Sequence, residues 1–119
     1  MTAQQMAEKI VEVLAGKLGR DIKLIKIDAI SVLADYFVLC TANSATQIRT
    51  LCDEVEKAME DSGEKRLHRE GHRAGGWVLL DYGVVVVHVF MEEARQFYGL
   101  ERLWADAAEI DISRHVGER

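Results

Sequence analysis

The sequence places two histidines and a carboxylate at alternate positions of one short segment, at His68, Glu70 and His72. In an extended strand these three side chains share a face, because side chains alternate with a period of two. Two imidazoles and a carboxylate can hold a divalent metal with an open coordination position. No further ligand cluster accompanies the trio, so solvated residues at the entrance to a glycine-rich loop are the simpler interpretation. We therefore expect no metal and no cofactor.

A second candidate chemistry is nucleophilic catalysis by a thiolate, with Cys40 or Cys52 as nucleophile and His88 as base. Thiolate chemistry needs a nearby basic or cationic partner. Cys40 lies in an apolar run and Cys52 on an apolar helical stripe, so both are expected to be small core residues. His88 interrupts a run of valines and shares a face with Val86 and Phe90. Either a core histidine or a histidine on a binding face fits that pattern.

Two further patterns concern phosphate groups. Gly71 and Gly76 have the spacing of the two glycines in a phosphate-binding loop. Trp77 and Val78 stand where that loop needs its lysine and hydroxyl, so the chemistry is lost. A basic cluster in the same region lacks interleaved aromatic residues and is expected to make at most an electrostatic contact with RNA. The cluster consists of Lys65, Arg66, His68, Arg69, His72 and Arg73.

Large aromatic side chains, with Met91 and Arg95, gather between residues 77 and 104. These residue types dominate the hot spots of protein interfaces. In the run 77–82 both faces of the predicted strand include large apolar groups, so both need cover. We expect one face to lie under helices and the other under a partner, with cover by the chain itself as the alternative. The group comprises Trp77, Tyr82, Phe90, Met91, Arg95, Phe97, Tyr98 and Trp104.

Hydrophobic periodicity predicts the elements that position these residues. A first helix begins after Thr2 and ends by Gly19, and a second begins after Asn43 or Ser44 and ends at Gly63. Residues 22–27 form a predicted strand near a sheet edge. Residues 36–41 form an unbroken apolar strand, which is typical of a sheet centre.

The second half of the chain predicts a short strand around 67–70 and a hairpin of 77–82 with 84–90 about Gly83. A last helix begins at Glu92 and is kinked or broken at Gly99. This order indicates a single α/β domain with a mixed sheet of about five strands flanked by helices. We expect residues 1–107 to form the domain and 108–119 to be a polar, flexible tail.

Composition restricts the class of protein. The chain has 119 residues and a net charge of −5, which argues against a simple nucleic-acid coat protein. Two cysteines do not make a disulfide framework. No apolar run approaches the ~20 residues that span a bilayer, and the first twenty residues lack the signal-peptide pattern. We expect a cytoplasmic protein without membrane contact.

Several runs of the sequence are distinctive: 35–38 with 47–55, Glu70-Gly71 with 77–83, and 88–104. Together they closely resemble the ribosomal silencing factor family, also called the Iojap or RsfS family, over roughly residues 3–107. The family's α/β fold is similar to that of nucleotidyltransferases. The sequence lacks their Gly-Ser followed by paired Asp, and metal-assisted phosphoryl transfer needs those carboxylates. The resemblance implies a nucleotidyltransferase-like fold without enzyme activity, and Val84 departs from the Asp that family members commonly carry.

The resemblance also implies a translational repressor. Such factors bind the large ribosomal subunit through its ribosomal protein fourteen and block joining of the small subunit when nutrients are scarce. An acidic chain should dock on a ribosomal protein, with at most peripheral contact to ribosomal RNA. The alternatives are an enzyme that uses the histidine trio or a cysteine with His88, and a homodimer through the second apolar strand face. The implied partner-binding residues are Trp77, Leu79, His88, Met91, Arg95, Tyr98 and Leu100.

Overall fold

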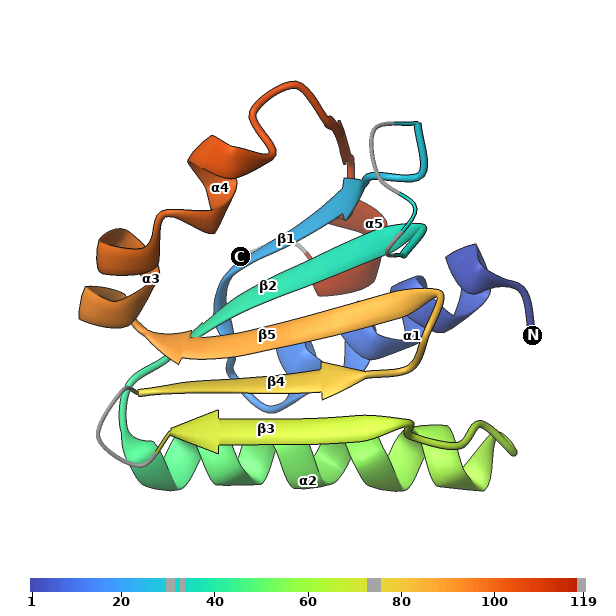
Figure 1. The fold of residues 1–119 in the computed structure, drawn as a ribbon. Coiled ribbons are helices and arrows are strands. Elements are labelled where there is room, and N and C mark those ends of the chain that lie inside the picture. Colours follow the sequence, from blue (N-terminus) through green and yellow to red (C-terminus); the bar gives the residue numbers. More distant parts are fainter. Residues whose placement is uncertain (30–31, 33, 73–75, 118–119) are drawn as a thin grey trace.

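The computed structural model describes residues 1–29, 32, 34–72 and 76–117, which form one mixed sheet with helices on both faces (Figure 1). The predicted order of eight elements is confirmed, and the sheet has six strands instead of about five. The elements are α1 (Ala3–Gly16), β1 (Arg20–Lys26), β2 (Tyr36–Ala42), α2 (Ala45–Asp61), β3 (His68–His72), β4 (Trp77–Asp81), β5 (Val85–Met91), α3 (Glu92–Tyr98), α4 (Leu100–Leu103), β6 (Ala108–Ile110) and α5 (Ser113–Val116).

The strands lie in the order β3-β4-β5-β2-β1-β6. β2 pairs in parallel with β5, and every other neighbouring pair is antiparallel. All seven residues of β2 are buried, which confirms its predicted place at the centre of the sheet. β1 lies beside the edge strand β6, as expected for a strand near an edge. The sheet therefore presents its hairpin, β4 and β5, between the edge strand β3 and the buried centre.

The helix ends form at the predicted residues. At α1 the amide N–H of Gln5 donates to the Thr2 hydroxyl (3.0 Å), and the amide N–H of Thr2 donates to the side chain of Gln5 (2.8 Å). Ser44 caps α2 by accepting from the amide N–H of Gln47 (3.0 Å). Gly63 follows α2 with φ at +80°, a left-handed conformation that favours glycine. Local hydrogen bonds thus set the limits of both long helices.

The two sheet faces are covered unequally. α1 and α2 pack along one face, and their apolar stripes bury the side chains that β2 and β5 send to that side. In the part of the chain that the structure describes, the helices on the opposite face are the short α3 and α4, which together have eleven residues and lie to one side in Figure 1. Trp104 and Ala107, which follow α4, also pack on this face. Gly99 separates α3 from α4 in the left-handed conformation (φ +59°), which confirms the predicted break. The strands near β3 therefore keep part of this second face open.

The structure adds two elements that we did not predict, both within 108–119. β6 pairs antiparallel with β1, and α5 packs near α1, where His115 contacts Glu8 and Glu12. Three apolar side chains of this segment pack against the core, too few to produce a periodic signal in the sequence. The domain limit at 107 and the flexibility of the tail stay predictions. The three residues are Ile110, Ile112 and Val116.

Candidate functional site

Exposed and partly exposed apolar side chains gather on the sheet face that carries α3 and α4. On β4, Trp77 and Leu79 project to this side together because side chains alternate along a strand. Val86 of β5 continues the row. Tyr98 of α3 and Leu100 of α4 adjoin it from the helices. We call these five side chains the aromatic face.

Trp77 is the best fixed member of the aromatic face. Its ring centroid lies 4.6 Å from that of Tyr98, 5.7 Å from that of His88 and 6.0 Å from that of Phe90. Its indole N–H donates a hydrogen bond to Nδ1 of His88 over 3.2 Å. The ring of Trp77 is therefore partly exposed, and it is held in place by packing against α3 and by a hydrogen bond to β5.

His88 lies beneath the aromatic face and is only 3% exposed. Its ring packs edge to face with Phe37, with 4.9 Å between the centroids. Burial lowers the pKa of His88 to about 4, so the imidazole is neutral at neutral pH. Its Nε2 atom is buried and has no hydrogen-bond partner among the described residues. The histidine is therefore a core residue with one of its two nitrogens in use.

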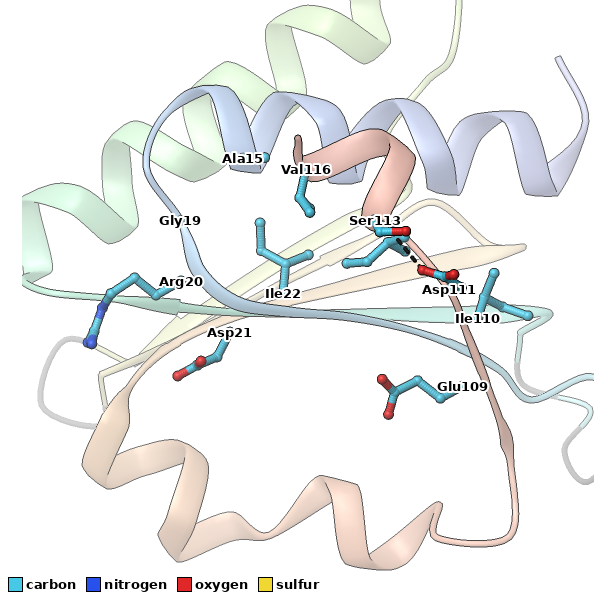
Figure 2. Close-up of a pocket in the computed structure, with 11 residues that line it drawn as sticks. Ala15, Gly19, Arg20, Asp21, Ile22, Glu109, Ile110, Asp111, Ser113 and Val116 are labelled. Atoms are coloured by element: carbon cyan, nitrogen blue, oxygen red, sulfur yellow. Dashed lines mark hydrogen bonds between the residues drawn. The ribbon is translucent and has the colours of Figure 1, made fainter. Parts of the chain in front are cut away.

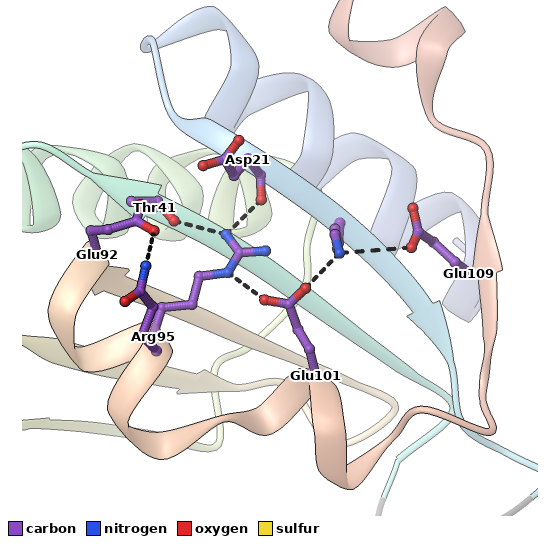
Figure 3. Close-up of polar contacts among 8 residues, drawn as sticks. Asp21, Thr41, Glu92, Arg95, Glu101 and Glu109 are labelled. Carbon is purple, nitrogen blue, oxygen red and sulfur yellow. Dashed lines mark hydrogen bonds and ion pairs between the residues drawn. The ribbon is translucent and has the colours of Figure 1, made fainter.

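Arg95 anchors α3 to the sheet from inside the protein (Figure 3). Its side chain is 7% exposed. Nη1 donates to the Thr41 hydroxyl (2.7 Å) and to the backbone oxygen of Asp21 (2.6 Å), and Nε donates to Glu101 (2.8 Å). The guanidinium also lies over the ring of Phe90, 5.6 Å from its centroid. Three segments of the chain meet on this one side chain.

Glu101 extends the same network to β1. Lys23 donates to its second carboxylate oxygen over 2.5 Å and also lies 4.0 Å from Glu109. Burial alone would raise the pKa of Glu101, but hydrogen bonds from Arg95 and Lys23 outweigh it and hold the pKa below its usual value. The ion pairs thus join α3 and α4 to β1.

An open pocket of about 560 Å³ lies elsewhere, between the end of α1, the start of β1 and the segment from β6 to α5 (Figure 2). Its wall combines the apolar side chains of Ile22, Ile110 and Val116 with the carboxylates of Asp21 and Glu109. None of the seven predicted partner-binding residues lines this pocket. It is therefore separate from the aromatic face.

Comparison with known proteins settles the family. A model of the family described as "Ribosomal silencing factor during starvation" matches residues 1–119. The chain belongs to this family. It is 33% identical over 112 residues to ribosomal silencing factor RsfS of Halalkalibacterium halodurans, covering 94% of this chain and 96% of that protein. It is 38% identical over 96 residues to RsfS of Bacillus subtilis, covering 81% of each.

A solved structure supports the fold. The protein in this crystal structure, from Chromobacterium violaceum, is 31% identical in sequence to this chain. The two structures have a TM-score of 0.84, and the comparison covers 88% of each chain. The predicted resemblance to the silencing factors and the predicted α/β class are both confirmed. The structure also shows no helix, among the residues it describes, with the length and apolarity needed to cross a membrane.

Within this silencing-factor fold, the seven predicted partner-binding residues do not share one surface. Four belong to the aromatic face: Trp77, Leu79, Tyr98 and Leu100. His88 and Arg95 are buried, and their polar atoms serve contacts within the chain. Met91 packs against the core under α1 and α2, on the opposite side of the sheet from its neighbour Phe90. Partner contact by the first four stays a prediction.

Two residues of the site were absent from the predicted seven. Val86 lies opposite Asp81 across the hairpin, so the hairpin register was the signal that could have identified it. Phe37 supports His88 and packs edge to face with Trp104 at 5.3 Å. Its place depends on the parallel pairing of β2 with β5, for which the sequence holds no local signal.

The histidine trio does not form a metal site in the part of the chain that the structure describes. Nε2 of His68 lies 2.8 Å from Glu70, and both side chains are exposed. His72 lies in β3, but its side chain is outside the described part of the structure. Among the residues that were described, no group of three potential ligands is close enough to hold a metal ion.

The basic cluster is largely neutralised by α2. Arg66 pairs with Glu56 at 2.5 Å, and Arg69 contacts both Glu56 (3.0 Å) and Asp53 (3.2 Å). The predicted member Arg73 lies outside the described residues, as does most of the stretch between the two glycines of the loop pattern. Two of the three described Lys and Arg side chains of the cluster are therefore paired with carboxylates of α2, and Lys65 is exposed.

The two cysteines are expected to be inert toward thiol reagents in the folded protein. Cys40 points to the face under α1 and α2 while His88 points to the other, so they cannot form a dyad. Burial raises the pKa of both Cys40 and Cys52 to about 12, which lowers the thiolate fraction roughly a thousandfold. Labelling with a thiol probe at pH 8 should be complete in urea and negligible without it. Rapid labelling of the native protein would contradict their burial.

Proposed function

We propose that the protein is a translational repressor that docks on the large ribosomal subunit through the aromatic face and blocks subunit joining by its bulk. The observation that carries this proposal is the partly exposed, well fixed Trp77 on a sheet face that the chain leaves partly uncovered. Exposed aromatic groups of this kind mark interaction surfaces. A steric mechanism requires no catalytic residue, and the repressor would act in the cytoplasm.

The family resemblance points to ribosomal protein fourteen of the large subunit as the docking partner. The charge of the chain favours a protein partner over RNA, because a net charge of −5 repels phosphate. Two carboxylates also lie beside the aromatic face: Glu70 pairs with Leu79 across β3 and β4, and Asp81 follows on β4. An apolar surface with an acidic rim is complementary to a basic protein surface.

Trp77→Ala is expected to weaken binding to purified large subunits about thirtyfold, the effect of removing a central anchor. Sedimentation of the protein with separated subunits measures this. Leu67→Ala is the matched control, because Leu67 is an exposed apolar residue before β3 and outside the aromatic face. The control should bind like the wild type.

Unchanged sedimentation of Trp77→Ala would show that Trp77 is not an anchor. Binding to small subunits alone would contradict the proposed mode of repression. Light scattering of the free protein at several concentrations tests the competing use of this face, a homodimer. A dimer that Trp77→Ala dissociates, without subunit binding by the wild type, would replace the ribosomal proposal.

A further inference from the structure

The indole of Trp77 forms its hydrogen bond with a residue of β5 that is not its direct cross-strand neighbour. In the register of β4 and β5, Trp77 pairs with Phe90 and Leu79 pairs with His88. The hydrogen bond from the indole N–H to Nδ1 of His88 (3.2 Å) therefore runs diagonally across the two strands. Such a bond restricts rotation of the ring about both side-chain torsions, in addition to the packing contact with Tyr98.

The chemistry of this pair determines the tautomer of the histidine. An indole N–H can only donate, so Nδ1 must be the accepting nitrogen and Nε2 carries the proton. Nε2 is buried and has no hydrogen-bond partner among the described residues. The rings that pack against His88 belong to Phe37, Trp77 and Phe90 and carry no charge.

A histidine in this position costs stability that a phenylalanine would not. A buried polar group without a partner is unfavourable, because it has lost its water and gained nothing in exchange. Phenylalanine has a similar shape, would pack against the same aromatic rings and has no polar atom to leave unpaired. Packing alone does not account for the imidazole. Its one polar contact, among the described residues, is the acceptor that it offers to Trp77.

We infer that His88 is a positioning residue for partner docking, which holds the indole of Trp77 in the orientation that the partner meets. The inference rests on the proposed function, because it assigns Trp77 as the anchor. A flat ring that is fixed before binding loses less rotational freedom when the partner closes on it. His88 itself stays covered and makes no contact with the partner.

Two substitutions of His88 distinguish the effect of losing the hydrogen-bond acceptor from the effect of losing the packed ring. His88→Phe retains a ring and removes the acceptor. His88→Asn retains an acceptor, because Oδ1 of asparagine occupies nearly the position of Nδ1, but it removes the rest of the ring. We expect His88→Phe to weaken binding to large subunits about tenfold and His88→Asn to bind within about threefold of the wild type. A purely structural role predicts the opposite order, since His88→Asn leaves a cavity.

A spectroscopic measurement reads the bond directly. NMR can resolve the indole N–H resonances of the two tryptophans, Trp77 and Trp104. The resonance that disappears in Trp77→Phe identifies Trp77. In the wild type the Trp77 indole proton should exchange with solvent more slowly than in His88→Phe. This result needs no partner and does not depend on the stability of His88→Asn. Equal exchange rates in the two proteins would overturn the inference.

The outcomes also distinguish this inference from the proposed function. If Trp77→Ala sediments with large subunits like the wild type, the docking surface is wrong whatever the indole exchange shows. If Trp77→Ala loses binding while folded His88→Phe retains it fully, docking through Trp77 stands and the positioning role of His88 is refuted. Loss in His88→Phe with retention in His88→Asn supports both.

Discussion

Replacing Arg95 with methionine is expected to lower the free energy of unfolding by about 3 kcal/mol, as for a buried ion pair that loses one partner. Methionine retains much of the apolar stem of Arg95 but none of its donors, and it removes the guanidinium that lies over the ring of Phe90. The buried hydroxyl of Thr41 and the part-buried backbone oxygen of Asp21 then lose the N–H donor that Arg95 supplies. Glu101 is one third exposed and keeps Lys23, which limits the loss to the lower part of the expected range. Urea unfolding followed by tryptophan fluorescence measures the change.

Lys23→Met is the matched control for the Arg95 prediction. It breaks the outer half of the same network, where both side chains are about one third exposed. Exposed ion pairs contribute little, so the control should lose less than about 1 kcal/mol. Similar losses in the two variants would mean that the network acts through its surface charges and that the buried contacts of Arg95 add nothing.

The parts of the fold that depend on neighbouring residues were predictable. The capping residues Thr2 and Ser44 accept from amides three residues away, and the hairpin forms about Gly83. In that turn the carboxylate of Asp81 accepts from the amide N–H of Gly83 (2.7 Å), and Val84 is exposed beside it. Each of these signals lies within a few residues of its effect, and sequence patterns record such relations well.

The inward direction of Arg95 was not predictable, because its partners lie far away in the sequence. Its hydrogen bonds reach Thr41, 54 positions earlier, and Asp21, 74 positions earlier. Arginine is mostly an exposed residue, so an interface role was the reasonable expectation for one near aromatic residues. Only the assembled sheet shows that the guanidinium of Arg95 makes its hydrogen bonds within the protein.

The place of Met91 could have been predicted. Alternation along a strand sends Met91 to the side opposite Phe90, whereas Trp77 shares a side with Phe90 across the hairpin. A single surface could not contain both Trp77 and Met91. β6 is different, since it is three residues long and exists through its pairing with β1.

Lowering the pH is expected to destabilise the protein through His88 before most carboxylates are protonated. Burial lowers the pKa of His88 from 6.5 to about 4 in the folded protein. Between these values the unfolded chain binds a proton at this residue and the folded protein does not. Stability therefore falls as the pH decreases through this interval and levels off for this group below pH 4. The full loss is about 3 kcal/mol, at 1.36 kcal/mol for each unit of pKa difference.

His88→Phe isolates this contribution, because the carboxylates that titrate in the same range are common to both proteins. Glu101, whose pKa lies below its usual value, loses its charge-dependent stabilisation in acid in wild type and variant alike. Urea unfolding at pH 7, 5.5 and 4 should show the stability difference shifting in favour of His88→Phe as the pH falls. A constant difference across the three pH values would mean that His88 accepts a proton in the folded protein as readily as in the unfolded chain. The ring would then have to reach water, contrary to its place beneath Trp77 and beside Phe37.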